Sequence, residues 1–238
     1  DQLGKEIVQE LYNVVRRQAE QGIQPVEKQD VAEVLRRRFF TPESIAKREG
    51  FRANVVSALE GIQALDEQTR KGRQTEEERY LASFPFHPDL TEVLYTKWTG
   101  LESFQRTRGV LRTFAIALRD AEKWDTSPII SAEILLNVPG KKELADAARE
   151  LAAVAASEEY EGKKQSWSAI LEGELEKARV IQKDSPMQNR EIEQAVIATF
   201  LHSQPAGQRA LSRDLLVLLG AGKPDRIELG KALMRWTE

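Results

Sequence analysis

The chain of 238 residues is long enough to bury a sizeable core, and 41% of its residues are hydrophobic. Its formal net charge of −3 excludes the strongly basic character typical of nucleic-acid-coating and membrane-surface proteins. Because it has no cysteine, disulfides, thiolate catalysis and zinc–cysteine sites are also excluded, and the composition fits a cytoplasmic protein. No apolar run approaches the roughly 20 residues needed to cross a bilayer.

Apolar residues recur at helical spacing along nearly the whole sequence, which predicts an all-α fold. The first stripe, from Leu3 to Val15, has no signal-peptide pattern and opens as if in mid-helix, so we expect a longer protein. A second helix carries Val31 to Phe39, and Thr41-Pro42-Glu43 has the residues that start a third element. The next apolar stripe runs from Val55 to Leu65.

Polar residues and prolines divide the middle of the chain. The stretch Asp66–Gln74 is predicted to be an exposed loop, and Thr75 and Glu78 have the spacing of a capping box that starts a helix. Pro85 and Pro88 block a continuous helix through the segment that contains them. Further helices are expected at about residues 88–98 and 104–123.

The C-terminal part combines long and short helices. Residues 140–183 are expected to form two long helices joined near Gly162, followed by three shorter helices at about 188–202, 210–219 and 225–236. Three short helices with a tight turn suit a helix-turn-helix or winged-helix-like end. We therefore divide the chain into a helical region (1–137), a long-helix connector (138–184) and a tri-helical region (185–238).

The usual catalytic motifs are missing from this sequence. No phosphate loop is present, because Gly220–Lys223 (GAGK) is followed by Pro224 in place of Ser or Thr. His87 and His202 have no metal-ligand spacing, and no pair of carboxylates stands out. We therefore expect no metal site and no complete catalytic site within the chain.

The segment FQRTRGVLRTFAIALRD (Phe104–Asp120) has two distinct helix faces. Its apolar residues occupy an arc of roughly 100°, while Arg108, Arg112 and Arg119 fall within about 40° of one another on another face. Guanidiniums aligned on an anchored helix suit bidentate contacts with phosphate or carboxylate. The alternative is a solvated face with salt bridges to neighbouring Glu residues. Gly109 is easiest to explain if a backbone or a ligand approaches closely there.

Two other basic clusters are candidates for binding. Arg36, Arg37 and Arg38 span about 200° of a helix, so they cannot share one helix face. We expect one of them to have a specific partner and the others to be solvated. Near the C-terminus, Arg226, Lys231 and Arg235 could contact a nucleic-acid backbone, although an exposed amphipathic helix explains them equally well.

Two stretches, FPFHPDLTEVLYTKW (Phe84–Trp98) and Phe104–Asp120, resemble the domain-of-unknown-function-499 proteins. These are large predicted AAA+ ATPases found beside DNA methyltransferases in bacterial and archaeal defence islands. VEKQDVAEVLRRRFF (Val26–Phe40) is similar to the passage from the ATPase core to its lid, and REIEQAVIATFLHSQ (Arg190–Gln204) to the start of a winged-helix-like region.

This resemblance implies a AAA+ lid-like domain whose sensor arginine reaches the γ-phosphate of ATP. Arg108 in T-R-G-V-L-R resembles that position, with Arg112 as the second choice and Arg38 and Arg119 as secondary candidates. Pro85, Phe86, His87 and Pro88 would brace the lid loop.

ATP and Mg²⁺ would be held mainly by a core preceding Asp1, so the chain is not expected to hydrolyse ATP alone. The implied partners are that core, DNA or a DNA methyltransferase system, and other copies of the protein, with no membrane.

Two alternatives remain at this point. A non-enzymatic helical adaptor would explain the missing catalytic groups, and it predicts a large exposed apolar patch. A DNA-binding helix-turn-helix protein would use residues 188–236, and it predicts binding that weakens steeply with salt.

Overall fold

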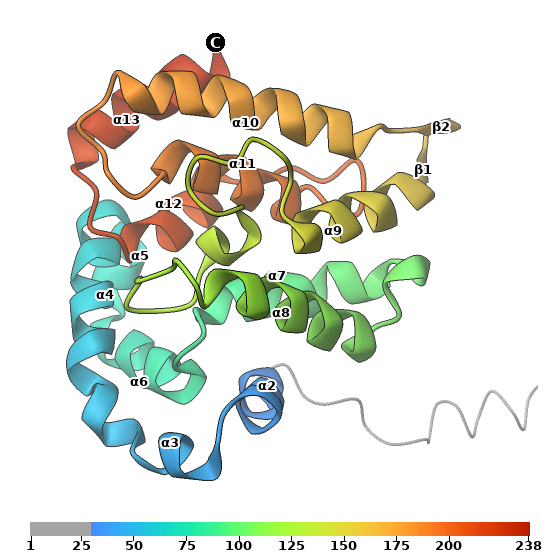
Figure 1. Ribbon diagram of the computed structural model, residues 1–238. Helices are drawn as coiled ribbons and strands as arrows, with labels where there is room; N and C mark the ends of the chain where they lie inside the picture. Colours follow the sequence, from blue (N-terminus) through green and yellow to red (C-terminus); the bar gives the residue numbers. More distant parts are fainter. Residues whose placement is uncertain (1–29) are drawn as a thin grey trace, which may run out of the picture.

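The predicted all-α fold is confirmed by the computed structural model, which describes residues 30–238. Within this range the regular structure consists of α-helices, short 3-10 turns and one small hairpin (Figure 1). The helix predicted around Leu3–Val15 lies outside the described residues. None of the helices in the described range is long and apolar enough to span a bilayer.

Five helices form one side and the base of the molecule, as oriented in Figure 1. They are α2 (Val31–Phe39), α3 (Pro42–Ala46), α4 (Arg52–Leu65), α5 (Glu67–Lys71) and α6 (Arg73–Ser83). The predicted start of α3 is confirmed, because the hydroxyl of Thr41 accepts a hydrogen bond from the amide of Ser44 and Pro42 is the first helical residue.

The prediction of a loop over Asp66–Gln74 is wrong. Asp66 caps a short helix instead: its carboxylate accepts hydrogen bonds from the amide (2.9 Å) and hydroxyl (2.6 Å) of Thr69. The predicted capping box is also wrong, since Thr75 and Glu78 lie inside α6. The stretch is polar because most of these helical residues face solvent, so polarity alone could not distinguish a loop from an exposed helix.

Two helices carry the motifs singled out in the sequence, α7 (Pro88–Thr96) and α8 (Thr107–Ala121). The second begins three residues later than expected, because Phe104 ends a 3-10 turn and Gln105 and Arg106 have positive φ angles. The chain thereby reverses so that the carbonyl of Phe104 packs against Gly109, where a Cβ would overlap it. Gly109 is therefore required by a close backbone contact.

The long-helix region contains α9 (Asp146–Ser157) and α10 (Trp167–Lys183). Between them the structure has an antiparallel hairpin of β1 (Glu159–Tyr160) and β2 (Lys163–Lys164), which projects at one edge of the molecule (Figure 1). Glu161 and Gly162 at its tip both have positive φ, as a tight two-residue hairpin turn requires. The expected junction near Gly162 is therefore this hairpin.

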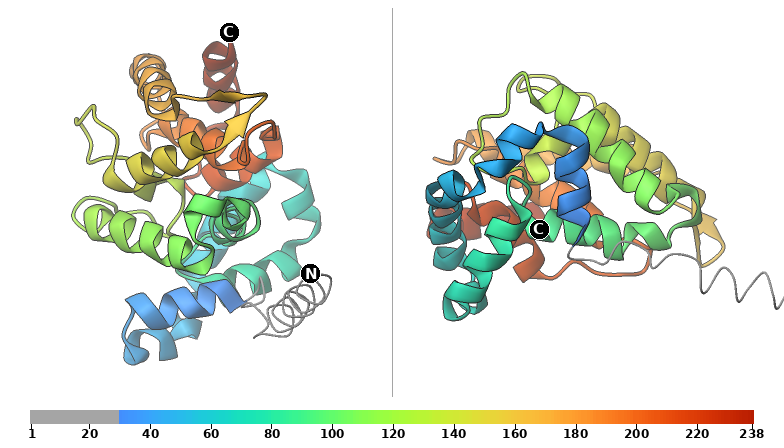
Figure 2. Two further views of the ribbon diagram at one scale, coloured as in Figure 1. Left: turned by 90° about the vertical axis from the view of Figure 1, so that its right-hand side faces the viewer. Right: turned by 90° about the horizontal axis from the view of Figure 1, so that it is seen from below.

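The last three helices are α11 (Glu191–His202), α12 (Ser212–Gly220) and α13 (Arg226–Thr237). Eleven of the twelve residues of α11 are buried, because α10, α12 and α13 all pack against it. The helices α10 and α13 form the outer layer above it (Figures 1 and 2). The larger of two hydrophobic clusters extends from Val31 to Trp236, and the smaller lies among α4, α6 and α12. The three-region division of the chain stays a prediction.

The helices α4 and α12 cross at an unusually short separation. A Cβ on Gly220 would lie 2.6 Å from the Cα of Ile62, and a Cβ on Gly61 would overlap the carbonyl oxygen of Gly220. Two glycines at one crossing therefore allow the backbones of α4 and α12 to touch.

We predict that Gly61→Ala lowers the free energy of unfolding by about 1–3 kcal/mol, because the added methyl group forces α4 away from α12. Urea unfolding measures the change. Gly173→Ala is the matched control, since nothing lies within 4 Å of a Cβ at this position in α10. It should raise stability by about 0.5–1 kcal/mol. A Gly61→Ala protein as stable as the parent would show that the crossing is not tight.

Candidate functional site

The segment Phe84–Pro88 links α6 to α7 and is fixed by backbone pairing. The amide of His87 donates to the carbonyl of Ile130 (2.8 Å), and the amide of Ile130 donates to the carbonyl of Pro85 (2.8 Å). Phe86 is fully buried, with its ring edge-on to Phe114 of α8 at 5.1 Å between centroids. The segment therefore connects α7, α8 and the loop around Ile130, and its role in bracing a lid loop stays a prediction.

His87 is fully buried beside the end of α12. Its Nδ1 accepts a hydrogen bond from the amide of Asp89 at 3.2 Å, so in the neutral ring the proton lies on Nε2. Nε2 faces the carbonyl oxygen of Val217 at 3.2 Å and the hydroxyl oxygen of Tyr80 at 2.9 Å. Burial lowers the pKa of His87 to about 4, so the ring is neutral at physiological pH.

Side chains bond to carbonyl groups at the buried C-terminal ends of α11 and α12. In α12, Ser131 donates from its hydroxyl to the carbonyl of Leu218 (3.2 Å), beside the contact of His87 with Val217. In α11, the indole of Trp98 donates to Leu201 (3.0 Å) and the ammonium of Lys97 donates to the carbonyl of His202 (2.7 Å). The stretch Phe84–Trp98 therefore provides side chains that cap the C-terminal ends of helices more than 100 residues further along the chain.

Among the three consecutive arginines of α2, the buried one is Arg36. Its guanidinium donates to the carbonyls of Ala82 and Phe84 at the end of α6 and forms an ion pair with Glu33. Arg38, the secondary candidate, is exposed, and its side chain forms no hydrogen bond or ion pair within residues 30–238. Arg36 holds α2 against α6, and nothing in the sequence distinguishes it from its two arginine neighbours.

The arginine face of α8 is exposed, as the helical spacing predicts. Arg112 forms a bidentate pair with Glu150 of α9 (2.7 and 2.8 Å), and Arg119 pairs with Asp120 (3.0 Å) and with Asp146 of α9 (3.7 Å). Arg108, in the first turn of α8, has no ion pair among residues 30–238. The structure thus contains both alternatives: salt bridges at two positions and an unengaged guanidinium at the third.

The cations of α13 differ in their surroundings. Lys231 pairs with Glu228 of the same helix (2.8 Å) and Arg235 with Asp184 (3.4 Å), whereas Arg226 is exposed. The other motif near this end, Gly220–Lys223, is the turn that ends α12, and the ammonium of Lys223 pairs with Glu60 (3.1 Å). No group of three His, Asp or Glu residues in the described range could hold a metal ion.

A buried carboxyl group that sequence reasoning missed lies next to the braced loop. Glu133 accepts a hydrogen bond from the amide of Ser131 at 3.1 Å, and burial, aided by the charge of Asp125, raises its pKa to about 8. Nothing in the local sequence distinguishes Glu133 from the many solvated Glu residues, because its burial comes from the packing of distant helices.

A family model described as the DUF499 second domain matches residues 26–204. The chain belongs to the DUF499 family. No curated protein and no solved structure matches it. The matched DUF499 region includes Arg36, the capping residues of Phe84–Trp98 and Arg108, whereas α12 and α13 lie beyond it.

We predict that acid destabilises the protein partly through His87. Because its pKa is lower in the folded state (about 4) than its ordinary 6.5, its contribution is present above pH 6.5 and is lost as the pH falls towards 4. The full loss amounts to about 3 kcal/mol. His87→Asn replaces the accepting Nδ1 by an amide oxygen that does not titrate, so the unfolding free energy of the variant should fall less between pH 7 and 4.5. Equal losses in both proteins would contradict the assignment.

Glu133 should have the opposite effect at higher pH. Its pKa is about 8 in the folded state against an ordinary value of 4.5, so its contribution is present below pH 4.5 and is lost as the pH rises through 8. Glu133→Gln should therefore be more stable than the parent at pH 8.5, by on the order of a few kcal/mol. Urea unfolding at pH 5.5 and 8.5 measures this, with exposed Glu143→Gln as control. A Glu133→Gln protein no more stable than the parent at pH 8.5 would contradict the raised pKa of Glu133.

Proposed function

We propose that this DUF499 chain is the lid and C-terminal helical region of a AAA+ ATPase, and that Arg108 senses the γ-phosphate of ATP. The observation that carries the proposal is the position of Arg108 on α8. The helix is anchored by its buried face, and Arg108 is the one arginine of the exposed row without an ion pair in the described range.

The start of α8 suits contact with an anion. The first turn of a helix presents unpaired amides and the positive end of the helix dipole, which add to the charge of a guanidinium. The contact of Gly109 with Phe104 fixes this turn relative to the preceding chain. A charge held in place in this way stabilises a phosphate at little reorganisation cost, and loss of the γ-phosphate removes its partner.

The remaining arginines rank behind Arg108. Arg112 lies on the same face but would have to leave Glu150 to reach a phosphate. Arg119 pairs with Asp120 and Asp146, and Arg38 lies on α2. We therefore assign sensing to Arg108, with Arg112 as the second choice.

We propose that the protein acts in the cytoplasm. It would belong to a bacterial or archaeal phage-defence or restriction-associated system. ATP and Mg²⁺ would be bound by a core with a phosphate loop, which this chain does not contain. The proposed partners are that core, DNA or a DNA methyltransferase system, and further copies of the protein. The ion pairs of Lys231 and Arg235 favour this proposal over DNA binding by α13.

We predict that Arg108→Ala, made in the protein that joins this chain to its phosphate loop, lowers ATP turnover about 100-fold or more. The reason is that one hydrogen-bond donor directed at the charge that develops in the transition state typically raises the catalytic rate by roughly 10²–10³. Steady-state phosphate release measures the loss. Arg108→Lys keeps the positive charge but loses the bidentate geometry of the guanidinium. Its ATP turnover should therefore lie between those of the parent and Arg108→Ala.

Arg209→Ala is the matched control for this experiment. Arg209 is also exposed and has no ion pair among residues 30–238, but it lies in the loop before α12. It should leave turnover unchanged, and unfolding curves should show that Arg108→Ala folds normally. Unchanged turnover in a folded Arg108→Ala protein would overturn the sensor assignment.

A further inference from the structure

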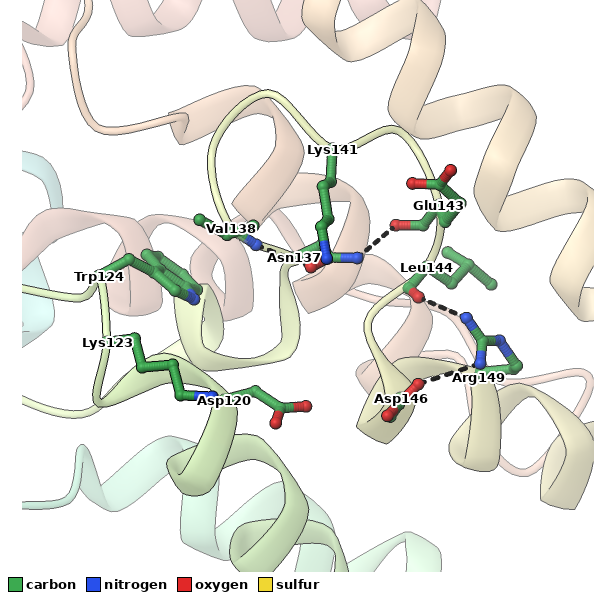
Figure 3. Close-up of a pocket in the computed structure, with 10 residues that line it drawn as sticks. All are labelled: Asp120, Lys123, Trp124, Asn137, Val138, Lys141, Glu143, Leu144, Asp146 and Arg149. Carbon is green, nitrogen blue, oxygen red and sulfur yellow. Dashed lines mark hydrogen bonds and ion pairs between the residues drawn. The ribbon is translucent and has the colours of Figure 1, made fainter.

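A cavity of about 500 Å³ lies between the end of α8 and the start of α9. In Figure 3, Trp124 and Lys123 lie on one side, Leu144 and Arg149 on the opposite side, and Lys141 above. Its volume falls within the range of small-molecule sites, roughly 300–1,000 Å³. The proposed sensor, Arg108, does not line this cavity.

Trp124 lines the cavity with a half-buried indole ring, and Arg190 packs against this ring. The guanidinium of Arg190 lies 5.8 Å from the centroid of its ring. Arg190 is itself held by Glu193 (2.7 Å) and by the carbonyl of Asn137 (2.7 Å), which also lines the cavity. A ring immobilised in this way can stack against a planar ligand with little loss of side-chain entropy.

Two lysines around the cavity have no carboxylate partner. Lys123 and Lys141 are exposed and form no ion pair within residues 30–238. Two of the acids at the rim are already engaged, because Asp120 pairs with Arg119 (3.0 Å) and Asp146 with Arg149 (3.0 Å).

Glu143 is the third acid at the rim, and its carboxylate has no such pair in the described range. The charges left for a ligand are therefore two ammonium groups and one carboxylate, beside an aromatic ring.

We propose that this cavity binds a nucleoside monophosphate. The base stacks on Trp124, the phosphate dianion lies between the ammonium groups of Lys123 and Lys141, and Glu143 accepts a hydrogen bond from an exocyclic amino group. A single carboxylate ligand would match only one of the two lysines.

This site is separate from the proposed sensor. Arg108 begins α8 and Lys123 follows its end, so about 22 Å of helix separates them. Binding in the cavity and sensing by Arg108 can therefore be tested independently.

Calorimetric titration of the chain with AMP, adenosine and ribose 5-phosphate tests the proposal. AMP should bind saturably, and the two probes that lack either the phosphate or the base should bind at least tenfold more weakly. Lys123→Ala/Lys141→Ala should weaken AMP binding about tenfold or more, because both ammonium groups that neutralise the phosphate are removed. Trp124→Ala should weaken it similarly, while Trp124→Phe should retain most of the affinity.

Lys142→Ala is the matched control, because Lys142 is the neighbour of Lys141 but pairs with Glu176 (3.6 Å) and does not line the cavity. It should leave AMP binding unchanged. Absence of saturable AMP binding at millimolar concentration, or equal weakening by Lys142→Ala, would overturn the proposal. Binding lost in Arg108→Ala but kept in the double lysine variant would also overturn it and would place the nucleotide at the start of α8.

Discussion

The fold depends on satisfying the carbonyl groups at the C-terminal ends of two buried helices. A helix leaves its last carbonyls without partners inside the helix, and away from water each unpaired one costs about 1–3 kcal/mol. The ends of α11 and α12 lie in the interior, where Trp98 and Lys97 bond to one and His87 and Ser131 to the other. Because these partners come from distant segments, the first half of the chain and the last three helices are joined by directional bonds as well as by the core.

This constraint explains why Phe84–Trp98 is distinctive in sequence. Proline breaks the helix so that His87 can point into the interior, where burial keeps the imidazole neutral. Arg36 caps the end of α6 in a similar way, because its guanidinium donates to the carbonyls of Ala82 and Phe84. The motif Phe84–Trp98 thus stabilises the framework, while the exposed face of α8 carries Arg108, which has no ion pair within residues 30–238.

Helical periodicity was sufficient to predict the all-α class, most helices and the two faces of α8, because burial follows the 3.6-residue repeat there. It could not predict α5, whose polar residues mostly face solvent, or the hairpin at Glu161-Gly162, which depends on local turn geometry. Nor could it select Arg36: relative to Leu35, Arg38 is about 60° away on the helix and Arg36 about 100°. Which of them is buried is decided by where α6 ends, and this is tertiary information. The same limit hid Glu133 and the cavity beside Trp124.

We propose that the start of α8 meets the γ-phosphate of ATP. Hydrogen–deuterium exchange of the amides of residues 107–114, in the protein that contains both this chain and its phosphate loop, tests this most directly. We predict slower exchange of these amides with a non-hydrolysable ATP analogue than with ADP, while those of α13 are unchanged. Identical exchange at residues 107–114 in the two nucleotide states would contradict the account.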